Sequence, residues 1–516
     1  MPAVAQGALP VPAADRVGAS AGYQLSRRLF IPVLGAVFLI AFSSLWPQLD
    51  GLIGAGGISP ASELLPWVHE QLGWKAYFRV PTLCWFSFAD GFLRGVCALG
   101  MALSVLLVLG VAPRWVLLAL WMLYLSLVSV GDVFLQYQWD NLLLETAFFA
   151  IFLASPRMLP GRAETAASPL AFWLLRWLLF RLMFLSGAVK LASGDAAWRE
   201  LTALRFHYWT QPLPTSLSYY VNLLPDGFQT ASAVVMFAIE LVVPFLIFGP
   251  RRARLFGAAS IAFLQIAIAA TGNYGFFNLL SLALCLLLLD DATLSKVLPR
   301  RLAIGAEPVP TPTRLQRGFR NAFAVAAVFF VLVSVAEMRF WRRDLPSPIE
   351  DLLGVLQPFR SINSYGLFAV MTTKRPEIIV EGSEDGRIWH AYEFKWKPGN
   401  PERSPQFVAP HQPRLDWQMW FAALGSCARN PWFIRFQQRL LEGTPEVLRL
   451  LDTNPFPASP PRYIRSMVYD YRFSDWGEHQ RMRVFWDRAF VGAYCPILSL
   501  QNGRLVAVSA KSLEGQ

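Results

Sequence analysis

Long apolar runs separated by short polar or basic stretches fill the first two thirds of the chain. Runs of about 20 apolar residues are long enough to cross a bilayer as helices. The pattern predicts nine membrane spans, of which 133–155 and 276–290 also fit re-entrant or tilted segments. The nine are residues 29–46, 92–111, 115–131, 133–155, 170–192, 229–248, 255–271, 276–290 and 321–338.

Basic side chains mark every second connection between these spans. Membrane proteins concentrate Lys and Arg in their cytoplasmic connections. All the basic groups fall on one side if the amino terminus is cytoplasmic and the number of spans is odd. The pattern therefore predicts a cytoplasmic amino terminus and an extracytoplasmic carboxy terminus. The basic groups are Arg27 and Arg28, Arg114, Arg157 and Arg162, "PRRAR" (250–254) and the basic residues of 296–320.

Beyond residue 338 the pattern changes to alternating and mixed sequence. "RPEIIVEGSEDGRIWHAYEFKW" (375–396) predicts a β-hairpin around a glycine-containing loop, and "RYIRSMVYDYRFSD" (462–475) predicts another strand. Between them, 415–426 and 431–443 have the spacing of short amphipathic helices. We expect a polytopic α-helical membrane protein with a carboxy-terminal, β-rich extracytoplasmic domain.

Three regions follow from these patterns. Residues 1–24 are rich in Ala, Pro and Gly and are expected to be a disordered tail, residues 25–338 the transmembrane helical domain, and residues 339–516 the extracytoplasmic β-rich domain. The one long linker, "IGAEPVPTPT" (304–313), is expected on the cytoplasmic side.

Composition supports a membrane protein and argues against nucleic-acid binding. The 516 residues are 54% hydrophobic and 16% charged, whereas soluble domains carry about 25% charged residues. The net charge of +11 comes from arginines that cluster between apolar runs, which is the pattern of membrane topology. The bilayer is therefore the first expected partner, and nucleic acid is not one.

No motif for a metal, a cofactor or a catalytic centre is present. The five cysteines form neither a C-x-x-C pair nor a zinc-like spacing. A phosphate loop, a dinucleotide fingerprint, a zinc-helix motif and a G-x-S-x-G elbow are all missing from the sequence. We assign no catalytic, cofactor-binding or metal residue. In an extracytoplasmic domain Cys427 and Cys495 would share an oxidising compartment, so they are the candidate disulfide.

Charged residues inside the predicted spans are the first candidate site. A charge within the bilayer persists when it is paired or faces a protein or water interior. Rise per residue places Glu145 and Arg181 both roughly 18 Å below the outer boundary, with Glu240 a second candidate partner and Asp140 nearer Lys190. Either these groups form buried ion pairs that fix helix register, or they line a polar cavity for a substrate, a lipid group or a proton. The predicted network is Asp140, Asn141, Glu145, Arg181, Lys190 and Glu240.

Two aromatic-rich segments are the second candidate site. In the outer loop 198–225, aromatic residues either anchor the protein at the headgroups or form a docking surface. In 409–425, a folded motif is expected in which Arg414 and Asp416 satisfy neighbouring backbone and the tryptophans pack; a His411–Asp416 metal or catalytic pair lacks a third ligand. Exposed aromatic side chains would offer a client-contact surface. The candidates are His207, Trp209, Tyr219, Tyr220, His411, Arg414, Asp416, Trp417 and Trp420.

Six blocks, in order, resemble the lipase maturation factor family, and the similarity covers residues 25–500. They are "GLIGAGGISP" (51–60), "QYQWDNLLLETAFFAIFLA" (136–154), "RLMFLSGAVKLASGDAAWRELTALRFHYWTQPLP" (181–214), "TGNYGFFNLLSLALCLLLLDD" (271–291), "YGLFAVMTTKRPEIIVEGSEDG" (365–386) and "FVAPHQPRLDWQMWFAALG" (407–425).

The resemblance implies a chaperone-like, multi-pass membrane protein that helps secreted lipases or other exported clients reach their active, assembled form. Animal members reside in the endoplasmic reticulum with the carboxy-terminal domain in the lumen, which agrees with the orientation predicted here. The family has no defined catalytic residue set, so no enzyme activity is expected. This sequence lacks Asn-x-Ser/Thr acceptors and ends in "KSLEGQ", which is not a retrieval signal. A bacterial inner membrane is therefore favoured, or the endoplasmic reticulum for a eukaryotic source.

Two other function classes stay open at this point. The arrangement faintly resembles vitamin K-dependent carboxylase-like membrane enzymes, with Lys190, His207 and Asp140 as candidate groups acting on a lipid or protein substrate in a polar cavity. A transporter usually shows paired halves with broken helices, and no such internal symmetry is visible in the sequence.

Overall fold

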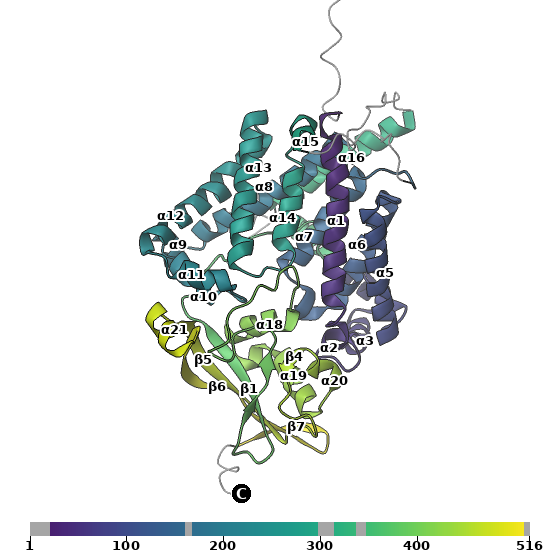
Figure 1. Cartoon of the computed structure of the whole chain (residues 1–516). Helices are drawn as coiled ribbons and strands as arrows, with labels where there is room; N and C mark the ends of the chain where they lie inside the picture. Colours follow the sequence, from purple (N-terminus) through teal and green to yellow (C-terminus); the bar gives the residue numbers. More distant parts are fainter. Residues whose placement is uncertain (1–20, 160–167, 298–313, 337–346, 510–516) are drawn as a thin grey trace, which may run out of the picture.

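The computed structural model describes residues 21–159, 168–297, 314–336 and 347–509. A bundle of helices forms one end of the elongated molecule and a sheet domain the other (Figure 1). Residues 1–20 of the predicted tail, the linker 304–313 and the predicted domain boundary at 338/339 lie outside the described residues. The rest of the predicted tail is ordered: a helical turn spans Ala21–Tyr23, and α1 begins at Gln24.

Six helices in the described part of the chain are long and apolar enough to cross a membrane. A bent pair, with 112° between its two helices, makes up to seven. The six are α1 (Gln24–Leu45), α5 (Asp90–Val108), α6 (Pro113–Val130), α8 (Pro169–Ala192), the continuous segment of α12 (Asp226–Phe237), η5 (Ala238–Val242) and η6 (Val243–Phe248), and α13 (Arg251–Thr271); the bent pair is α14 (Phe277–Leu286) with α15 (Asp291–Val297).

Six of the nine predicted spans are therefore supported as full-length helices among the described residues, and the run 276–290, which also fitted a re-entrant segment, belongs to the bent pair. The run 133–155 yields α7 (Gln138–Leu153), which has 16 residues and is mostly buried. The run 276–290 yields the 10-residue α14, and 321–338 contributes only the apolar part Ala324–Val335 of α16 (Arg314–Ala336). An apolar run indicates that a segment is shielded from water. It does not indicate whether protein or lipid surrounds that segment.

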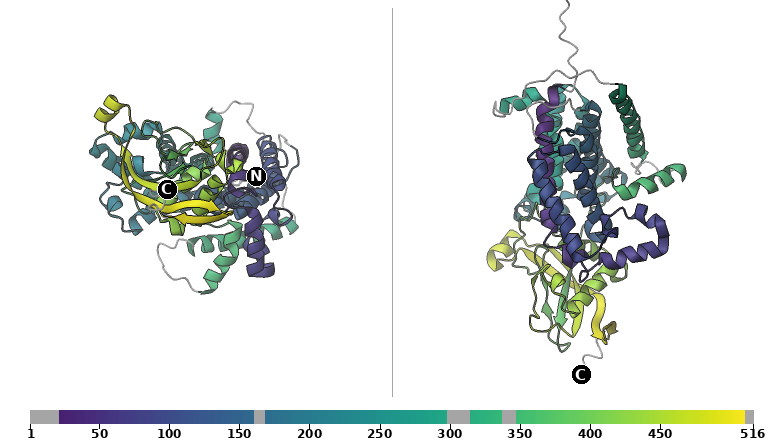
Figure 2. Two further views of the ribbon diagram at one scale, coloured as in Figure 1. Left: turned by 90° about the horizontal axis from the view of Figure 1, so that it is seen from below. Right: turned by 90° about the vertical axis from the view of Figure 1, so that its right-hand side faces the viewer.

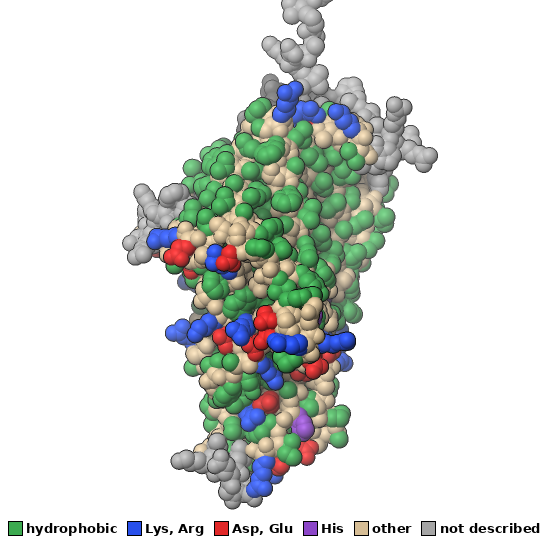
Figure 3. All heavy atoms as spheres, turned by 60° about the vertical axis from the view of Figure 1, so that its left-hand side comes forward, with side chains coloured by type: hydrophobic (Ala, Val, Ile, Leu, Met, Phe, Trp, Pro, Cys, Tyr) green, Lys and Arg blue, Asp and Glu red, His purple; other side chains and the backbone are tan. Residues whose placement is uncertain are grey.

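The long helices run back and forth between the two ends of the bundle (Figure 1). At one end, the backbone N–H groups of Gln24 and Leu25 at the start of α1 donate to Asp291, over 3.0 and 2.8 Å. Arg251 at the start of α13 donates to Asp290 over 2.6 Å. Basic side chains gather at this end of the molecule (Figure 3). The sheet domain covers the opposite end, so the two ends of the bundle differ in chemistry.

The sheet domain is built around five antiparallel strands in the order β2-β1-β5-β6-β7 (Figure 2). The hairpin, the second strand and the two helices predicted from the sequence are confirmed as β1–β2, β5, α18 and α19. The strands are β1 (Pro376–Ser383), β2 (His390–Ala391), β5 (Tyr463–Phe473), β6 (Trp486–Gln501) and β7 (Arg504–Val508), with a separate pair of β3 (Glu393–Phe394) and β4 (Leu451–Thr453); the helices are α18 (Arg414–Ala423), α19 (Pro431–Leu441), α20 (Pro445–Leu448) and α21 (Trp476–Met482).

Short helices fill the boundary between the two domains. On one side they carry exposed aromatic side chains: Trp67, Trp74, Phe78 and Phe86 are 60, 67, 61 and 84% exposed. This segment protrudes from the flank of the bundle (Figure 2, right). The boundary helices are α2 (Leu49–Ile53), α3 (Ala61–Leu72), α4 (Ala76–Arg79), α9 (Ala196–Arg199), α10 (Leu204–Thr210), α11 (Ser216–Asn222) and α17 (Ser347–Leu356).

A disulfide joins Cys427 to Cys495, with their Cα atoms 5.5 Å apart. It ties the turn η10 (Cys427–Arg429), which precedes α19, to the middle of β6. The candidate pairing predicted from the sequence is therefore confirmed. Cys84, Cys97 and Cys285 are free and buried in the helical domain.

Replacing Cys427 and Cys495 by Ala should destabilise the sheet domain, because the bridge closes a loop of sequence separation 68. A loop of this size is worth about 4 kcal/mol in the chain-entropy picture. Alkylation of the denatured protein without reductant should label the three free thiols, and all five after reduction. Labelling of five thiols without reductant would contradict the bridge.

Candidate functional site

Glu145 and Arg181 face each other in the middle of α7 and α8 and are fully buried. Arg181 donates one hydrogen bond to Glu145 and another, of 3.1 Å, to the carbonyl of Asn363. The second carboxylate oxygen of Glu145 accepts from the backbone N–H and side-chain amide of Asn363 (3.1 and 3.0 Å) and from the Tyr365 hydroxyl (2.8 Å). The predicted pairing of Glu145 with Arg181 is confirmed, and it also fixes the segment after α17.

Asp140 pairs with Arg414, which comes from the first turn of α18 in the sheet domain. The two guanidinium nitrogens donate to the two carboxylate oxygens over 2.8 and 2.9 Å, and both side chains are buried. The Tyr124 hydroxyl also donates to Asp140, and Arg414 donates to the Phe134 carbonyl over 2.7 Å. This bidentate pair joins the two domains.

Two sequence-based expectations about this pair are wrong. Asp140 was expected to face Lys190 or an outer cavity mouth, and Arg414 was expected to bond neighbouring backbone. The sequence argument compared depths along the helices, so it considered only charges inside the predicted spans. Arg414 lies outside them, 274 residues after Asp140 in the sequence. Asp416 does bond backbone, but that of a distant segment: its carboxylate accepts from the N–H groups of Trp396 (2.8 Å) and Lys397 (2.9 Å), which lie 20 and 19 residues before it.

Lys190 pairs with Glu240, which sits in the π-helical turn η5. The ammonium donates to both carboxylate oxygens over 2.8 and 3.0 Å and to the Ser186 carbonyl over 3.0 Å. Gly187 permits this approach, because a Cβ there would lie 2.9 Å from the Cβ of Glu240. Glu240 is therefore not a partner of Arg181. The remaining member of the predicted network, Asn141, contributes its backbone carbonyl to the Asn363 amide over 3.4 Å.

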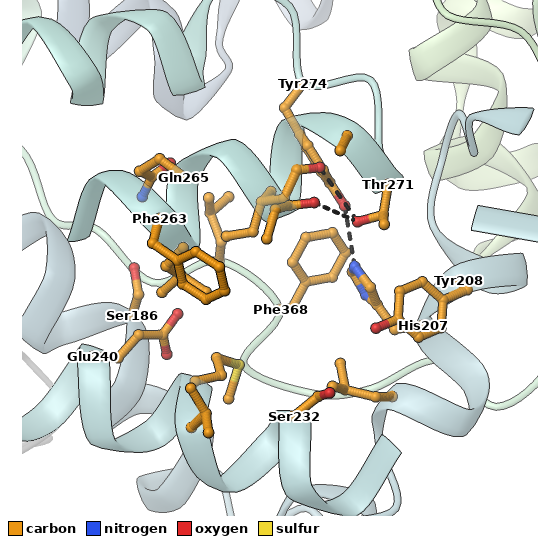
Figure 4. Close-up of a pocket in the computed structure, with 18 of the residues that line it drawn as sticks. Ser186, His207, Tyr208, Ser232, Glu240, Phe263, Gln265, Thr271, Tyr274 and Phe368 are labelled. Atoms are coloured by element: carbon orange, nitrogen blue, oxygen red, sulfur yellow. Dashed lines mark hydrogen bonds between the residues drawn. The ribbon is translucent and has the colours of Figure 1, made fainter. Parts of the chain in front are cut away.

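The Lys190–Glu240 pair borders a cavity of about 580 Å³ (Figure 4). Its walls come from α8, from the α12–η5 segment and from α13, and α10, α11 and Phe368 close one side. Most lining side chains are apolar. The polar lining residues are Ser186, Lys190, His207, Tyr208, Ser232, Glu240, Gln265, Thr271 and Tyr274.

His207 lies at one side of this cavity and is a neutral group. Burial, with Lys190 nearby, lowers the pKa of His207 to about 4. The Tyr274 hydroxyl donates to the side-chain oxygen of Gln211 over 2.7 Å and lies 3.3 Å from Nε2 of His207. Since the tyrosine proton is used by Gln211, the imidazole Nε2–H is the donor of the second contact.

Aromatic residues expected to form an exposed client surface are mostly buried. Trp417 packs edge-on against Trp139 in α7, with ring centroids 4.7 Å apart. Trp420 donates its indole N–H to the Thr210 carbonyl over 2.7 Å, and Tyr219 is enclosed by rings of the sheet domain. Exposure is therefore wrong for these three, and the alternative that the tryptophans of 409–425 pack is confirmed for Trp417 and Trp420. All three side chains contact both the sheet domain and the bundle or its boundary helices.

Among the five aromatic candidates Trp209, Tyr219, Tyr220, Trp417 and Trp420, two present surface. Tyr220 is 48% exposed, and Trp209 is partly exposed. His411 contacts the Ser44 hydroxyl of α1 over 2.9 Å, which makes it another connection between domains. Within the described residues, no group of three or more His, Cys, Asp or Glu side chains could hold a metal ion.

A buried charged cluster escaped the sequence reasoning. Arg375 and Lys397 both pair with Glu377, over 2.8 and 3.0 Å, and all three are buried. Arg375 also donates to the carbonyls of Trp209 and Pro212, over 2.7 and 2.8 Å. It thereby ties the outer loop to β1. No pattern in the sequence indicates this cluster, because basic and acidic residues at the start of a strand usually face solvent.

A multi-pass helical membrane domain locked by buried ion pairs to a disulfide-bonded antiparallel sheet domain defines the class of this protein. Comparison with known proteins then assigns the family. The family described as "Lipase maturation factor transmembrane domain" matches residues 25–296, and "Lipase maturation factor C-terminal domain" matches residues 361–496. The chain belongs to the lipase maturation factor family.

Similar proteins cover nearly the whole chain. Human "Lipase maturation factor 2" is 36% identical over an alignment that includes 94% of this chain and 84% of the human protein. Bovine "Lipase maturation factor 1" is 35% identical, with 93% of this chain and 90% of the bovine protein covered. The frog (Xenopus tropicalis) "Lipase maturation factor 2" is 34% identical, over 92% of this chain and 83% of its own. No solved structure matches the chain.

Asp140→Asn should loosen the junction between the domains, because it leaves the Arg414 guanidinium buried without its carboxylate. Breaking a buried pair costs about 3–5 kcal/mol. We expect faster limited proteolysis of the sheet domain and less folded protein, and partial recovery in the double variant Asp140→Asn with Arg414→Met. Asp226→Asn, which removes an exposed pair with Arg205, is the control. A proteolysis rate equal to that of this control would contradict the proposed role of the junction.

Glu145→Gln should also lower the amount of folded protein, by a similar free energy of about 3–5 kcal/mol. The double variant Glu145→Gln with Arg181→Gln should recover part of it, since no charge is then left alone. The exposed pair of Glu63 with Arg435 supplies the control Glu63→Gln, for which the expected cost is only about 0–1 kcal/mol. Folded yield is measured by fluorescence-detected gel filtration; a double variant worse than either single one would refute the pairing argument.

Proposed function

We propose that this protein is a maturation factor that assists the folding or assembly of secreted lipases or related exported clients. The observation that carries the proposal is the similarity to named lipase maturation factors, which extends over both domains and more than nine tenths of the chain. The buried ion pairs support it indirectly. They join helices to one another and the bundle to the sheet domain, as expected of a rigid platform.

We further propose a cytoplasmic amino terminus and an extracytoplasmic sheet domain. The gathering of basic groups at the bundle end opposite the sheet supports this orientation (Figure 3). So does the Cys427–Cys495 bridge, because disulfides persist in oxidising compartments. We place the protein in a bacterial inner membrane, or in the endoplasmic reticulum if the source is eukaryotic. The domain boundary is proposed at residues 338/339, between the two family matches.

The client-contact surface is proposed on β6 rather than on the buried aromatic residues. β6 runs over Trp486–Gln501, but its pairing with β7 covers only Ile497–Gln501. On that side, residues 486–496 have no partner strand among the described residues. Phe490 and Val491 in this stretch are 60 and 63% exposed. An open strand edge with apolar side chains is a template for pairing with an extended segment of another chain.

A membrane-embedded enzyme acting on a lipid or protein substrate is the second candidate. The observation that favours it is the cavity that brings Lys190, Glu240 and His207 together. Asp140, the third group proposed for such a centre, binds Arg414 instead, so that set is not assembled. An enzyme would lose activity on a single conservative change such as Lys190→Arg while folded protein persists.

Deleting the gene should selectively lower the activity of secreted lipase or esterase, and the wild-type gene should restore it. The double variant Phe490→Lys with Val491→Lys should restore less than about a third of that activity at equal abundance, because charges at the open edge disfavour an apolar strand. Val506→Lys, on the paired strand β7, is the matched control. The measurement is client activity together with quantitative proteomics of exported proteins. An unchanged exported proteome with altered membrane lipids would overturn the maturation role and favour the enzyme.

A further inference from the structure

We propose that the cavity between α12 and α13 holds the acyl chain of a neutral bilayer lipid, which enters sideways between these two helices. The proposal concerns a ligand site and stands independently of the maturation role. The cavity of about 580 Å³ lies within the range of about 300–1,000 Å³ that is typical of small-molecule sites.

The walls of the cavity are built for hydrocarbon. Both flanking segments, Asp226–Phe248 and Arg251–Thr271, are candidate membrane spans. Among the lining residues, Phe228 and Val235 of α12 are each 49% exposed, and Phe263 of α13 is 63% exposed. These side chains form an apolar rim on the outside of the bundle. The medium at this rim is lipid, so a lipid chain is the molecule available to fill the cavity.

The helices that form the walls are held apart along part of their length. At one end, α13 packs against η6, where a Cβ on Gly257 would lie 3.4 Å from Leu246. At the other end α11 stands beside α13, and the Thr215 hydroxyl donates to the Ala270 carbonyl over 2.7 Å. Between these contacts lies the cavity. The π-helical turn η5 projects Glu240 toward it (Figure 4), and π-helical turns often occur at functional sites.

The charges of the lining select a neutral ligand. Lys190 and Glu240 are the charged lining residues in the described chain, and they neutralise each other. His207 is uncharged near pH 7, because the pKa of its imidazole is lowered to about 4. An ionised headgroup would therefore be buried without a counter-charge, which is costly.

Hydroxyl-bearing residues remain for a neutral headgroup. Ser232 lies on the cavity side of α12, where its hydroxyl can donate to a ligand (Figure 4). Thr271 and Tyr274 lie across from it at the end of α13, and their hydroxyls donate to the Ala267 carbonyl (3.0 Å) and to Gln211 (2.7 Å), so toward a ligand their oxygens can only accept. Hydroxyl groups donate to ester carbonyls and accept from alcohols. This chemistry fits an acylglycerol with a free hydroxyl better than a phospholipid. The structure thus points to a diacylglycerol-like lipid, with its glycerol near Ser232 and Thr271.

The test uses the purified full chain in phosphatidylcholine nanodiscs with a diacylglycerol that carries a diazirine on one acyl chain. After irradiation, labelled peptides should come from 226–248 and 251–271 at least fivefold more than from α5. Unlabelled diacylglycerol should compete. A phosphatidylglycerol with the same diazirine chain should label the same peptides at least fivefold less.

Cavity-filling variants sharpen the test. Ala267→Trp and Ser232→Trp change lining positions and should lower labelling at least fivefold, whereas Val105→Trp, on an exposed position of α5, should leave it unchanged. Ser232→Leu is the milder variant if Trp prevents folding, which gel filtration reports. Even labelling of all lipid-facing helices, insensitive to these variants and to competitor, would show ordinary annular lipid and overturn the proposal. Stronger labelling by phosphatidylglycerol would overturn the assignment of a neutral ligand.

Discussion

The ion pair between Asp140 and Arg414 is the constraint on which the rest of the structure depends. Both groups are buried, and both oxygens of Asp140 are occupied by the guanidinium. Removing one partner leaves a buried charge that costs several kcal/mol. Neither domain can therefore bury its half of the junction without the other half. Further buried hydrogen bonds also join the two domains. Gln48, just after α1, accepts from the Arg414 backbone N–H over 2.8 Å and donates to the Gln412 carbonyl over 2.9 Å. The sheet domain is thus a structural part of the bundle, joined to it by buried polar groups.

Helix α7 organises these contacts because it carries two carboxylates in an otherwise apolar sequence. Asp140 at its first turn meets Arg414, and Glu145, further along, meets Arg181 and the segment around Asn363. The helix is short and mostly buried, so its charges contact protein rather than lipid. Each carboxylate fixes one direction of packing: one toward the sheet domain and one across the bundle. This explains why an apolar helix retains acidic residues whose burial would otherwise be unfavourable.

The sequence allowed prediction of those features that depend on local pattern or on position within one helical domain. Alternation predicted β5 and the β1–β2 hairpin, and matched depth predicted the pairing of Glu145 with Arg181. The sequence did not allow prediction of contacts between segments that are far apart along the chain. Arg414 lay in a segment expected outside the membrane. For Trp417 the sequence left both packing and client contact open, because aromatic residues serve both interfaces and cores. Two of the nine predicted spans, 133–155 and 321–338, are not among the six or seven candidates in the described residues, since hydropathy does not distinguish a helix such as α7, buried in protein, from one exposed to lipid.

The two buried pairs on α8 differ in what surrounds them, and this difference links the cavity to the stability of the bundle. Arg181 and Glu145 are buried in protein and make further hydrogen bonds to Asn363 and Tyr365. Lys190 and Glu240 border open space. Water in that space would raise the local dielectric constant and weaken their attraction, whereas a hydrocarbon chain would keep it low and strengthen the pair. The same pair anchors η5 to α8 through the contact at Gly187. An acyl chain in the cavity would therefore stabilise the position of η5 and of the helices on either side of it. Through this pair, a lipid in the proposed site would couple the geometry of the α12–α13 region to the composition of the membrane.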